Sequence, residues 1–311
     1  MKLKGYLLAA LAAAAYGTNP VFAIPLYEQG MSVNSVLFFR YLLGIPLLAA
    51  LVLYRGHSLR LSRGQIGPVA ILGILMALSS LTLFASYNYI NAGVASTLLF
   101  VYPILVAVLM IFFFHERFRI SVAICLLVMC AGLSLLMKNS SGELLDPYGC
   151  LLVMMSALTY SLYIIMVNVS ENIRSIVTSK LLFYVLVWGT LLFIGFIAAG
   201  NTLTVPSKPS GWLNLAALAV IPTVLSLVCT TRAIQIIGPT PTAILGSLEP
   251  VSAVVLSVIV LHQGITVREI VGGVLIVLAT MLVVGDTTVE NLMLHVRRMF
   301  PRGNRLRRKR R

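Results

Sequence analysis

Charged side chains are scarce in this chain of 311 residues. Asp, Glu, Lys and Arg together make up 10% of the sequence, and only nine residues are acidic. In an ordinary water-soluble protein about 25% of the residues are charged. Here 59% of the residues are apolar and the mean hydropathy is +0.99, so there are too few charges to cover a surface that faces water. The shortage of charge excludes a water-soluble globular protein and indicates that lipid surrounds most of the chain.

Sequence motifs of catalytic and nucleotide-binding sites are also missing. The chain has no glycine-rich phosphate-binding loop, no GxSxG nucleophile elbow and no pair of carboxylates within an apolar segment. The string HERFR at 115–119 carries Arg119 where a zinc-binding HExxH motif needs its second histidine. We therefore expect no catalytic residue, no metal and no cofactor, and a membrane-embedded enzyme is the weaker alternative.

Cysteine is rare as well. The four cysteines, Cys125, Cys130, Cys150 and Cys229, all fall in apolar segments and show no metal-binding spacing. A free cysteine behaves as a small hydrophobic residue, so the sequence predicts buried, reduced thiols. No redox compartment follows from them.

Basic residues outnumber acidic residues by 23 to 9, yet they do not form a face for nucleic acid. Nine of them lie in the last fifteen positions, 297–311, and the other fourteen are spread thinly along the chain. A basic tail of this kind is expected to contact the anionic lipids of the inner leaflet. Binding of nucleic acid by the tail is the weaker alternative, and we expect no nucleic-acid partner.

Long apolar segments are what the sequence has in abundance. A helix needs about 20 apolar residues to cross a hydrocarbon core of about 30 Å. Ten segments approach this length, at about 6–27, 33–54, 66–88, 93–114, 119–137, 147–167, 176–199, 211–236, 240–261 and 266–285. The expected fold class is an all-α membrane protein with ten transmembrane helices. The first segment runs past the length of a signal-peptide core, so we expect a retained helix and not a cleaved signal.

The distribution of Lys and Arg predicts the orientation of these helices, because cytoplasmic loops carry an excess of both. With a cytoplasmic amino terminus, 19 basic residues lie on the inner side, and Lys138, Lys208 and Arg268 lie on the outer side. Arg40 falls within a segment. The sequence therefore predicts a multi-pass protein of the inner (cytoplasmic) membrane with both termini in the cytoplasm.

An internal repeat organises the ten segments. With a shift of 147 positions, residues 89–136 align without a gap on residues 236–283. The paired positions include Pro103 with Pro250, Tyr102 with Glu249 and, at a shift of 144, Tyr16 with Tyr160. Each half then holds five segments, and an odd number gives the two halves opposite orientations in the membrane. We predict two inverted five-helix repeats, residues 1–140 and 141–286, followed by a basic cytoplasmic tail at 287–311.

Two charged residues lie clearly within the apolar segments, and they are the strongest functional signals. A charge at the bilayer centre costs about 2.5–3.5 kcal/mol on insertion scales. Counted at 1.5 Å per residue, the depths of Arg40 and Glu249 differ by about 6 Å, which a long arginine side chain can span. We predict that Arg40 and Glu249 pair beside a polar cavity. The pair could bind a zwitterionic solute, or Glu249 could couple transport to protons; the alternative is a structural ion pair that locks two helices.

Prolines and tyrosines near the same depth complete the expected substrate-binding site. Pro103 and Pro250 occupy matching positions, and a proline kinks a helix and leaves a carbonyl free. A membrane tolerates a free carbonyl only beside protein or a water-filled cavity. A tyrosine combines an apolar ring with one hydroxyl and suits amphipathic solutes. The other expected cavity residues are Tyr102, Tyr16, Asn19, Tyr160 and Tyr163. The alternative for the kinks and the tyrosines is ordinary packing.

Three stretches of sequence resemble a known family. The segment ASYNYINAGVASTLLFVYPILVAVLMIFFFHERF, the segment TRAIQIIGPTPTAILGSLEPVSAVVLSVIVLHQGI and the string FFRYLLG around Arg40 are similar to the ten-helix EamA transporters of the drug/metabolite transporter superfamily. Two features depart from the family pattern: Ile24-Pro25 stands where a basic residue is common, and HQG replaces the second GE corner.

The resemblance covers about residues 5–285 and implies a carrier with a central cavity between two repeats. Such a carrier would move small organic metabolites, such as amino acids or related compounds, by alternating access, with export as the expected direction. Fold alone does not determine the solute. A lipid-translocating or structural membrane protein is the alternative.

Overall fold

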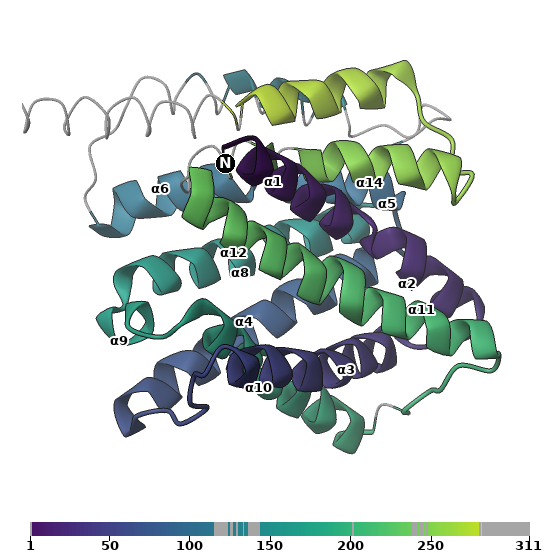
Figure 1. Cartoon of the computed structure of the whole chain (residues 1–311). Coiled ribbons are helices and arrows are strands. Elements are labelled where there is room, and N and C mark those ends of the chain that lie inside the picture. The colour runs from purple at the N-terminus through teal and green to yellow at the C-terminus, as the bar shows by residue number, and fades with distance from the viewer. Residues whose placement is uncertain are drawn as a thin grey trace, which may run out of the picture.

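The computed structural model describes residues 2–114, 144–200, 202–237 and 248–279, together with isolated positions between and after these ranges. Figure 1 shows a bundle of helices. In chain order they are α1 (Lys2–Gly17), α2 (Asn19–Glu28), α3 (Val33–Tyr54), α4 (Arg63–Ser86), α5 (Ala92–Leu99), α6 (Tyr102–Phe114), α8 (Pro147–Val169), α9 (Glu171–Arg174), α10 (Thr178–Ala198), α11 (Pro209–Ala219), η1 (Val220–Leu225), α12 (Ser226–Ile237) and α14 (Leu248–Ile259). A further helical segment covers 267–279.

Seven helices of the described part are long and apolar enough to cross a membrane. They are Leu3–Glu28, Val33–Tyr54, Arg63–Ser86, Ala92–Phe113, Pro147–Val167, Thr178–Ala198 and Pro209–Thr230. The shorter apolar helix α14 lies in the ninth expected segment, and the helical segment 267–279 lies in the tenth. Most of the fifth expected segment, 119–137, lies outside the described residues, as does the tail at 287–311. The all-helical, multi-pass class is confirmed, and seven candidate spans lie within the described residues, so the count of ten stays a prediction.

Polar residues at the ends of the apolar segments define where several helices begin. Ser32 caps α3, because its Oγ accepts a hydrogen bond from the backbone N–H of Ser35 at 3.3 Å. Ser62 and Gln65 form a capping box at the start of α4. The Asp146 carboxylate accepts two backbone N–H groups of the first turn of α8, at 2.8 and 2.9 Å. These caps satisfy backbone donors that a helix start leaves free, so the short polar loops determine where the helices begin.

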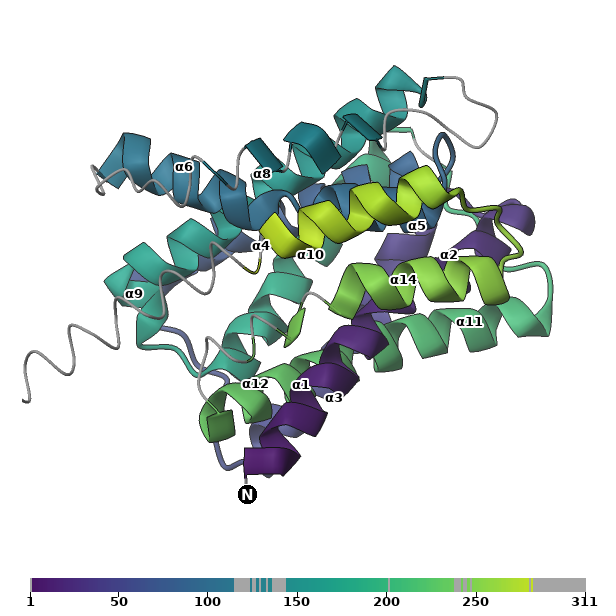
Figure 2. The same ribbon diagram turned by 90° about the horizontal axis from the view of Figure 1, so that it is seen from above.

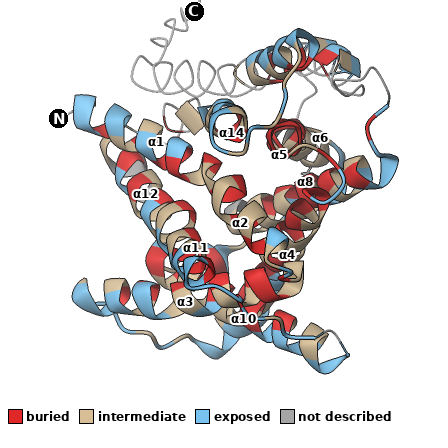
Figure 3. Cartoon of the chain, turned by 90° about the vertical axis from the view of Figure 1, so that its right-hand side faces the viewer, coloured by how far each residue is buried: buried red, intermediate tan, exposed pale blue. Residues whose placement is uncertain are grey.

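Burial is highest on the helix faces that meet inside the bundle. Figure 3 shows the buried residues on faces directed at neighbouring helices and the exposed residues on the outward faces. Many of the exposed side chains are large and apolar, including Leu53, Tyr54, Phe112 and Phe113. An apolar outer surface of this kind is stable only in lipid, since a water-soluble protein rarely exposes large apolar patches.

The main helix contacts come in pairs that the repeat relates: where two helices pack, the helices at the equivalent positions of the other repeat pack as well. α1 packs against α12 as α8 packs against α4, and α1 packs against α14 as α8 packs against α6. Likewise α4 packs against α10 as α11 packs against α3. Two further contacts, α3 with α10 and α5 with α14, each join a helix to its own counterpart in the other repeat. Figure 2 shows α14 beside α1. This pattern of contacts is that of a pseudo-two-fold arrangement of two repeats.

The cysteines differ in part from the prediction. Cys229 is buried, but Cys150 is half-buried and Cys130 is exposed, and all three are free thiols. Cys125 lies outside the described residues. The expectation of burial is wrong for Cys130, because lipid is itself apolar and an apolar side chain in a membrane segment need not face the inside of the bundle.

Candidate functional site

Three of the spanning segments are interrupted inside the bundle. The first breaks at Thr18, just before Pro20, and the fourth breaks at Phe100–Val101, just before Pro103. The eighth contains the π-helix η1, which includes Pro222. Proline removes a backbone donor and clashes with the preceding turn, which explains why each interruption lies beside one. Interrupted helices in a membrane are tolerated where protein or a cavity satisfies the backbone, and π-helical turns often mark functional sites.

Pro103 and Pro250 stand near the starts of equivalent helices. Pro103 is the second residue of α6, directly after the break that divides the fourth segment. Pro250 is buried and is the third residue of α14. The residues just before α14 are described only in part. The two prolines therefore occupy similar positions, and the break in the helix is visible before Pro103.

The helix pair α1–α14 brings two of the predicted residues together. A methyl group added to Gly17 would lie 2.1 Å from the Ser252 Oγ and 2.9 Å from the Glu249 carbonyl oxygen. Only glycine permits so close an approach of two backbones. The Ser252 hydroxyl also donates to the Glu249 carbonyl at 2.9 Å. The close crossing at Gly17 places the neighbouring residue Tyr16 near Glu249.

The repeat-related pair α8–α6 has an equivalent contact. The Ser161 hydroxyl donates toward the carbonyl oxygens of Tyr102, at 3.1 Å, and of Ala157, at 2.7 Å. The shift of 144 that pairs Tyr16 with Tyr160 also pairs Gly17 with Ser161, and Tyr102 is the repeat partner of Glu249. Both crossings therefore join positions that are equivalent in the two repeats.

Four of the predicted tyrosines and Glu249 form one cluster. The rings of Tyr102 and Tyr160 meet edge to face with centroids 4.8 Å apart, and Tyr160 and Tyr163 are stacked at 6.0 Å. Glu249 lies within electrostatic range of Tyr16, Tyr102 and Tyr160. All five side chains are half-buried. The structure thus gathers residues of α1, α6, α8 and α14 around one carboxylate.

Arg40 is buried and is held by groups that the sequence did not single out. Its side chain is 4% exposed, and its Nε donates to the Thr223 Oγ1 of η1 at 3.0 Å. The guanidinium carbon lies 5.1 Å from the centre of the Phe84 ring, within the range of a cation–π interaction. Arg40 acts electrostatically on Tyr16, but no ion pair joins it to Glu249 in the described part of the chain. The structure does not contain the predicted pair, because Thr223 and Phe84 hold the guanidinium instead.

Asn19 lies at the break between α1 and α2. Its side-chain nitrogen donates to the Tyr16 carbonyl at 2.8 Å. Its Oδ1 atom is buried and has no hydrogen-bond partner, and the residue is 2% exposed. Asn19 therefore satisfies one carbonyl at the break and leaves a buried acceptor beside the cluster, which is uncommon in folded proteins.

Sequence reasoning missed Thr223, Gly17, Ser252 and Tyr87. Tyr87 lies at the end of α4 and is within electrostatic range of both Arg40 and Glu249. A proline in mid-segment precedes Thr223, and a glycine directly follows Tyr16, so two of these residues carried a usable signal. Nothing in the sequence distinguishes Ser252 or Tyr87 from other polar residues of the apolar segments.

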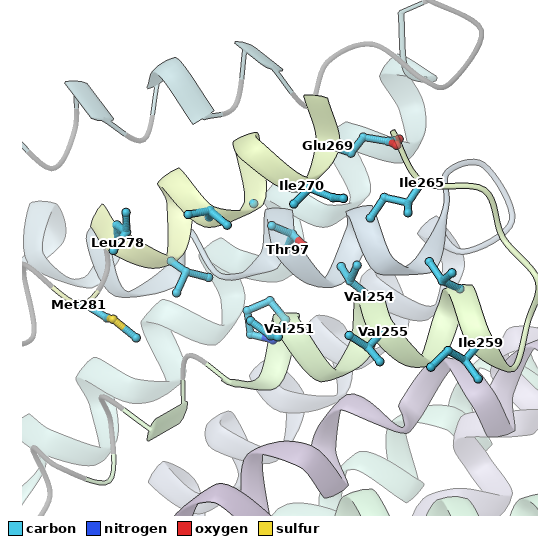
Figure 4. Close-up of a pocket in the computed structure, with 15 residues that line it drawn as sticks. Thr97, Val251, Val254, Val255, Ile259, Ile265, Glu269, Ile270, Leu278 and Met281 are labelled. Carbon is cyan, nitrogen blue, oxygen red and sulfur yellow. The ribbon is translucent and has the colours of Figure 1, made fainter. Parts of the chain in front are cut away.

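A separate groove of about 490 Å³ lies between α14 and the helical segment 267–279. Figure 4 shows Val254, Ile265 and Ile270 among the apolar side chains that line it. The two polar residues of the lining have partners. The Thr97 hydroxyl donates to the Gly93 carbonyl at 2.9 Å, and the Glu269 carboxylate accepts hydrogen bonds from the backbone N–H and the hydroxyl of Thr266. The groove therefore suits hydrocarbon and not a polar solute. Among the described residues, no group of three or more His, Cys, Asp or Glu could hold a metal ion.

Comparisons with known proteins agree with this arrangement. The sequence pattern of the EamA-like transporter family matches residues 3–138 and 147–285, one repeat in each half. A solved crystal structure, described only as that of a protein, is 19% identical over 95% of this chain and 98% of its own length, with a TM-score of 0.64. At that identity the likeness shows the fold alone. No curated protein matches the sequence significantly. The predicted resemblance is confirmed.

Proposed function

Because the chain belongs to the EamA-like transporter family, whose members are membrane transporters and not enzymes, we propose that it exports small organic metabolites across the cytoplasmic membrane. Amino acids and related compounds are the proposed solutes. The proposed units are the repeats 1–140 and 141–286, with the tail 287–311 on anionic lipids of the inner leaflet. The excess of basic residues on one side supports cytoplasmic termini.

One observation carries this proposal. Tyr16 is within electrostatic range of both Arg40 and Glu249, which belong to different repeats, and it lies two residues before the break of the first segment at Thr18. Charged groups and interrupted helices near the bilayer midplane are typical of the solute sites of secondary transporters. We place the solute in contact with Glu249, Tyr16, Tyr102 and Tyr160, with Arg40, Asn19 and Tyr163 at the edge of the site.

The pseudo-two-fold packing supports alternating access as the proposed mechanism. The crossings α1–α14 and α8–α6 are equivalent in the two repeats, so a rocking motion that opens one and closes the other would expose the cluster to each side in turn. Uptake of a proton by Glu249 is the proposed coupling step. The breaks at Thr18 and Phe100–Val101 would act as the hinges.

Flux measurements with purified protein in proteoliposomes test the proposal. A mixture of amino acids and small metabolites is loaded, and the solutes that leave are identified by mass spectrometry, with and without a proton gradient. We expect Glu249→Gln to lower the flux at least about tenfold, equivalent to about 1.4 kcal/mol. The matched control is Glu171→Gln, which alters an exposed acid of the short helix α9 and should leave the flux unchanged.

Two results would count against the proposal. Unchanged flux in both Glu249→Gln and Arg40→Ala would remove the site assignment. Absence of solute flux together with movement of a fluorescent phospholipid between the leaflets would favour the lipid-translocating alternative.

A further inference from the structure

Among the described residues, the Glu249 carboxylate has no partner of opposite charge. No described side chain donates a hydrogen bond to it, and its backbone carbonyl is engaged by the Ser252 hydroxyl. The residue is half-buried. Arg40, the described arginine that acts electrostatically on the same cluster, donates through its Nε to Thr223 and lies over the Phe84 ring. An acid inside a membrane bundle is normally paired, so within the described part of the chain Glu249 is open to a cation that a solute supplies.

Aromatic rings surround this unpaired acid. Tyr16, Tyr87, Tyr102 and Tyr160 all lie within its electrostatic range. Tyr102 meets Tyr160 edge to face at 4.8 Å, and Tyr160 stacks on Tyr163 at 6.0 Å, so the rings form one continuous aromatic wall beside the acid. The face of an aromatic ring attracts cations, and cages of aromatic rings are a known means of binding organic ammonium groups.

The chemistry of the cluster distinguishes between classes of cation. A divalent metal requires several carboxylate or carbonyl oxygens, and the described residues contain no group of three or more acidic, histidine or cysteine ligands. A single carboxylate with several aromatic rings instead fits a monovalent organic cation. In its ionised form such a carboxylate supplies one negative charge, and the rings supply a large apolar contact area.

We infer that the cluster of Glu249, Tyr16, Tyr102 and Tyr160 is an ammonium subsite, and that the solutes of this transporter carry an organic amine. This inference rests on the proposed function and specifies its substrate class. The amine lies against the Glu249 carboxylate and the tyrosine rings. Arg40 is a positioning residue: the hydrogen bond of its Nε to Thr223 holds α3 to η1.

Binding of three probes of matched shape tests the inference. The purified full chain in lipid nanodiscs is dialysed against radiolabelled 2-phenylethylammonium, with neutral 2-phenylethanol and anionic phenylacetate as competitors. We expect saturable binding of the ammonium probe that neither competitor displaces at equal concentration. Glu249→Gln should weaken binding at least about tenfold, and the control Glu171→Gln should leave it unchanged.

Variants of the rings separate their role from that of the acid. Tyr102→Phe and Tyr160→Phe keep the ring face and should bind within about threefold of the native chain, whereas Tyr102→Leu should weaken binding about fivefold or more. Circular dichroism and thermal midpoints of the same nanodisc samples establish that each variant is folded.

The possible outcomes separate this inference from the proposed function. Equal competition by the alcohol or by the carboxylate, or unaltered binding in a folded Glu249→Gln variant, would overturn the ammonium subsite. Flux of neutral or anionic solutes without ammonium binding would overturn the subsite and leave the transporter proposal standing. Ammonium binding without flux of any solute would support the subsite and contradict transport.

Discussion

The two repeat-related crossings, α1 with α14 and α8 with α6, share a geometry and differ in chemistry. In both, a serine hydroxyl donates to a backbone carbonyl, that of Glu249 in the first crossing and that of Tyr102 in the second. Glu249 and Tyr102 occupy equivalent positions in the two repeats. The hydroxyl comes from Ser252 on α14 itself in the first crossing and from Ser161 on the facing helix α8 in the second. Gly17 leaves room for the first arrangement.

This difference indicates how a duplicated fold can hold one asymmetric site. The same two helices of each repeat take part in the two crossings, so duplication supplies the scaffold. The side chains at the equivalent positions are an acid and a phenol, so the two halves contribute different chemistry to one cluster. The three predictions below alter one crossing at a time, in order of decreasing effect.

Enlarging Gly17 should have the largest effect. In Gly17→Val the added carbons would meet the Ser252 Oγ at 2.1 Å and two backbone atoms of α14 at 2.9 Å. Overpacking of this kind is expected to lower the free energy of unfolding by about 3 kcal/mol. The free energy is measured by titration with SDS from mixed micelles. The control is Gly195→Val, where an added Cβ meets nothing within 4 Å; an equal loss in the control would show that Gly17 has no special role.

Removing the hydroxyl that holds Arg40 should have an intermediate effect. Thr223→Val keeps the shape of the side chain but leaves the buried Arg40 Nε without its acceptor. A hydrogen bond to a charged group contributes about 1.5–3 kcal/mol, and a loss of this size is expected in the same titration. Thr230→Val is the matched control, since Thr230 bonds only a carbonyl of its own helix, that of Ser226. Equal losses in the two variants would contradict the assignment of Thr223.

Truncating the two serines should have the smallest effect, and it compares a hydroxyl that bonds within α14 with one that joins α8 to α6. Ser161→Ala and Ser252→Ala each remove one neutral hydrogen bond to a paired carbonyl, and each should lower the free energy of unfolding by about 0.5–1.5 kcal/mol. Similar losses are expected. A loss confined to one variant would show that only one crossing depends on its hydroxyl.

Much of the fold could be predicted from the sequence because it depends on the lengths of the apolar segments and on the repeat that relates them. The length of an apolar segment indicates a membrane span, and the shift of 147 positions indicates which helices are equivalent. The same shift identified Tyr102 and Glu249 as partners, and both lie in the cluster. In contrast, the partner of Arg40 could not be derived, because counting residues along a helix gives the depth of a side chain but not its direction around the axis.

The direction of Thr223 depends on the π-helix, for which Pro222 was the only sign in the sequence. The predicted pair of Arg40 and Glu249 failed for this reason: the depths were compatible, but a hydroxyl lay nearer to the guanidinium than the carboxylate did. The contributions of Ser252 and Tyr87 depend on how helices from different halves meet, which no local pattern of residues reveals.

The π-helix η1 allows the eighth segment to hold one extra residue without changing the face that the rest of the segment presents. A π-helical turn holds about one residue more than an α-helical turn, so the extra residue is taken up within η1 and the helix after it keeps its orientation. In a helix that stayed regular, the same extra residue would rotate everything after it by about 100° and move it by about 1.5 Å along the axis. Ser226, whose hydroxyl donates to the Ala12 carbonyl of α1 at 2.9 Å, would then turn away from the first helix. The surplus residue is thus absorbed in the turn that carries Thr223, and α12 keeps the face that packs against α1.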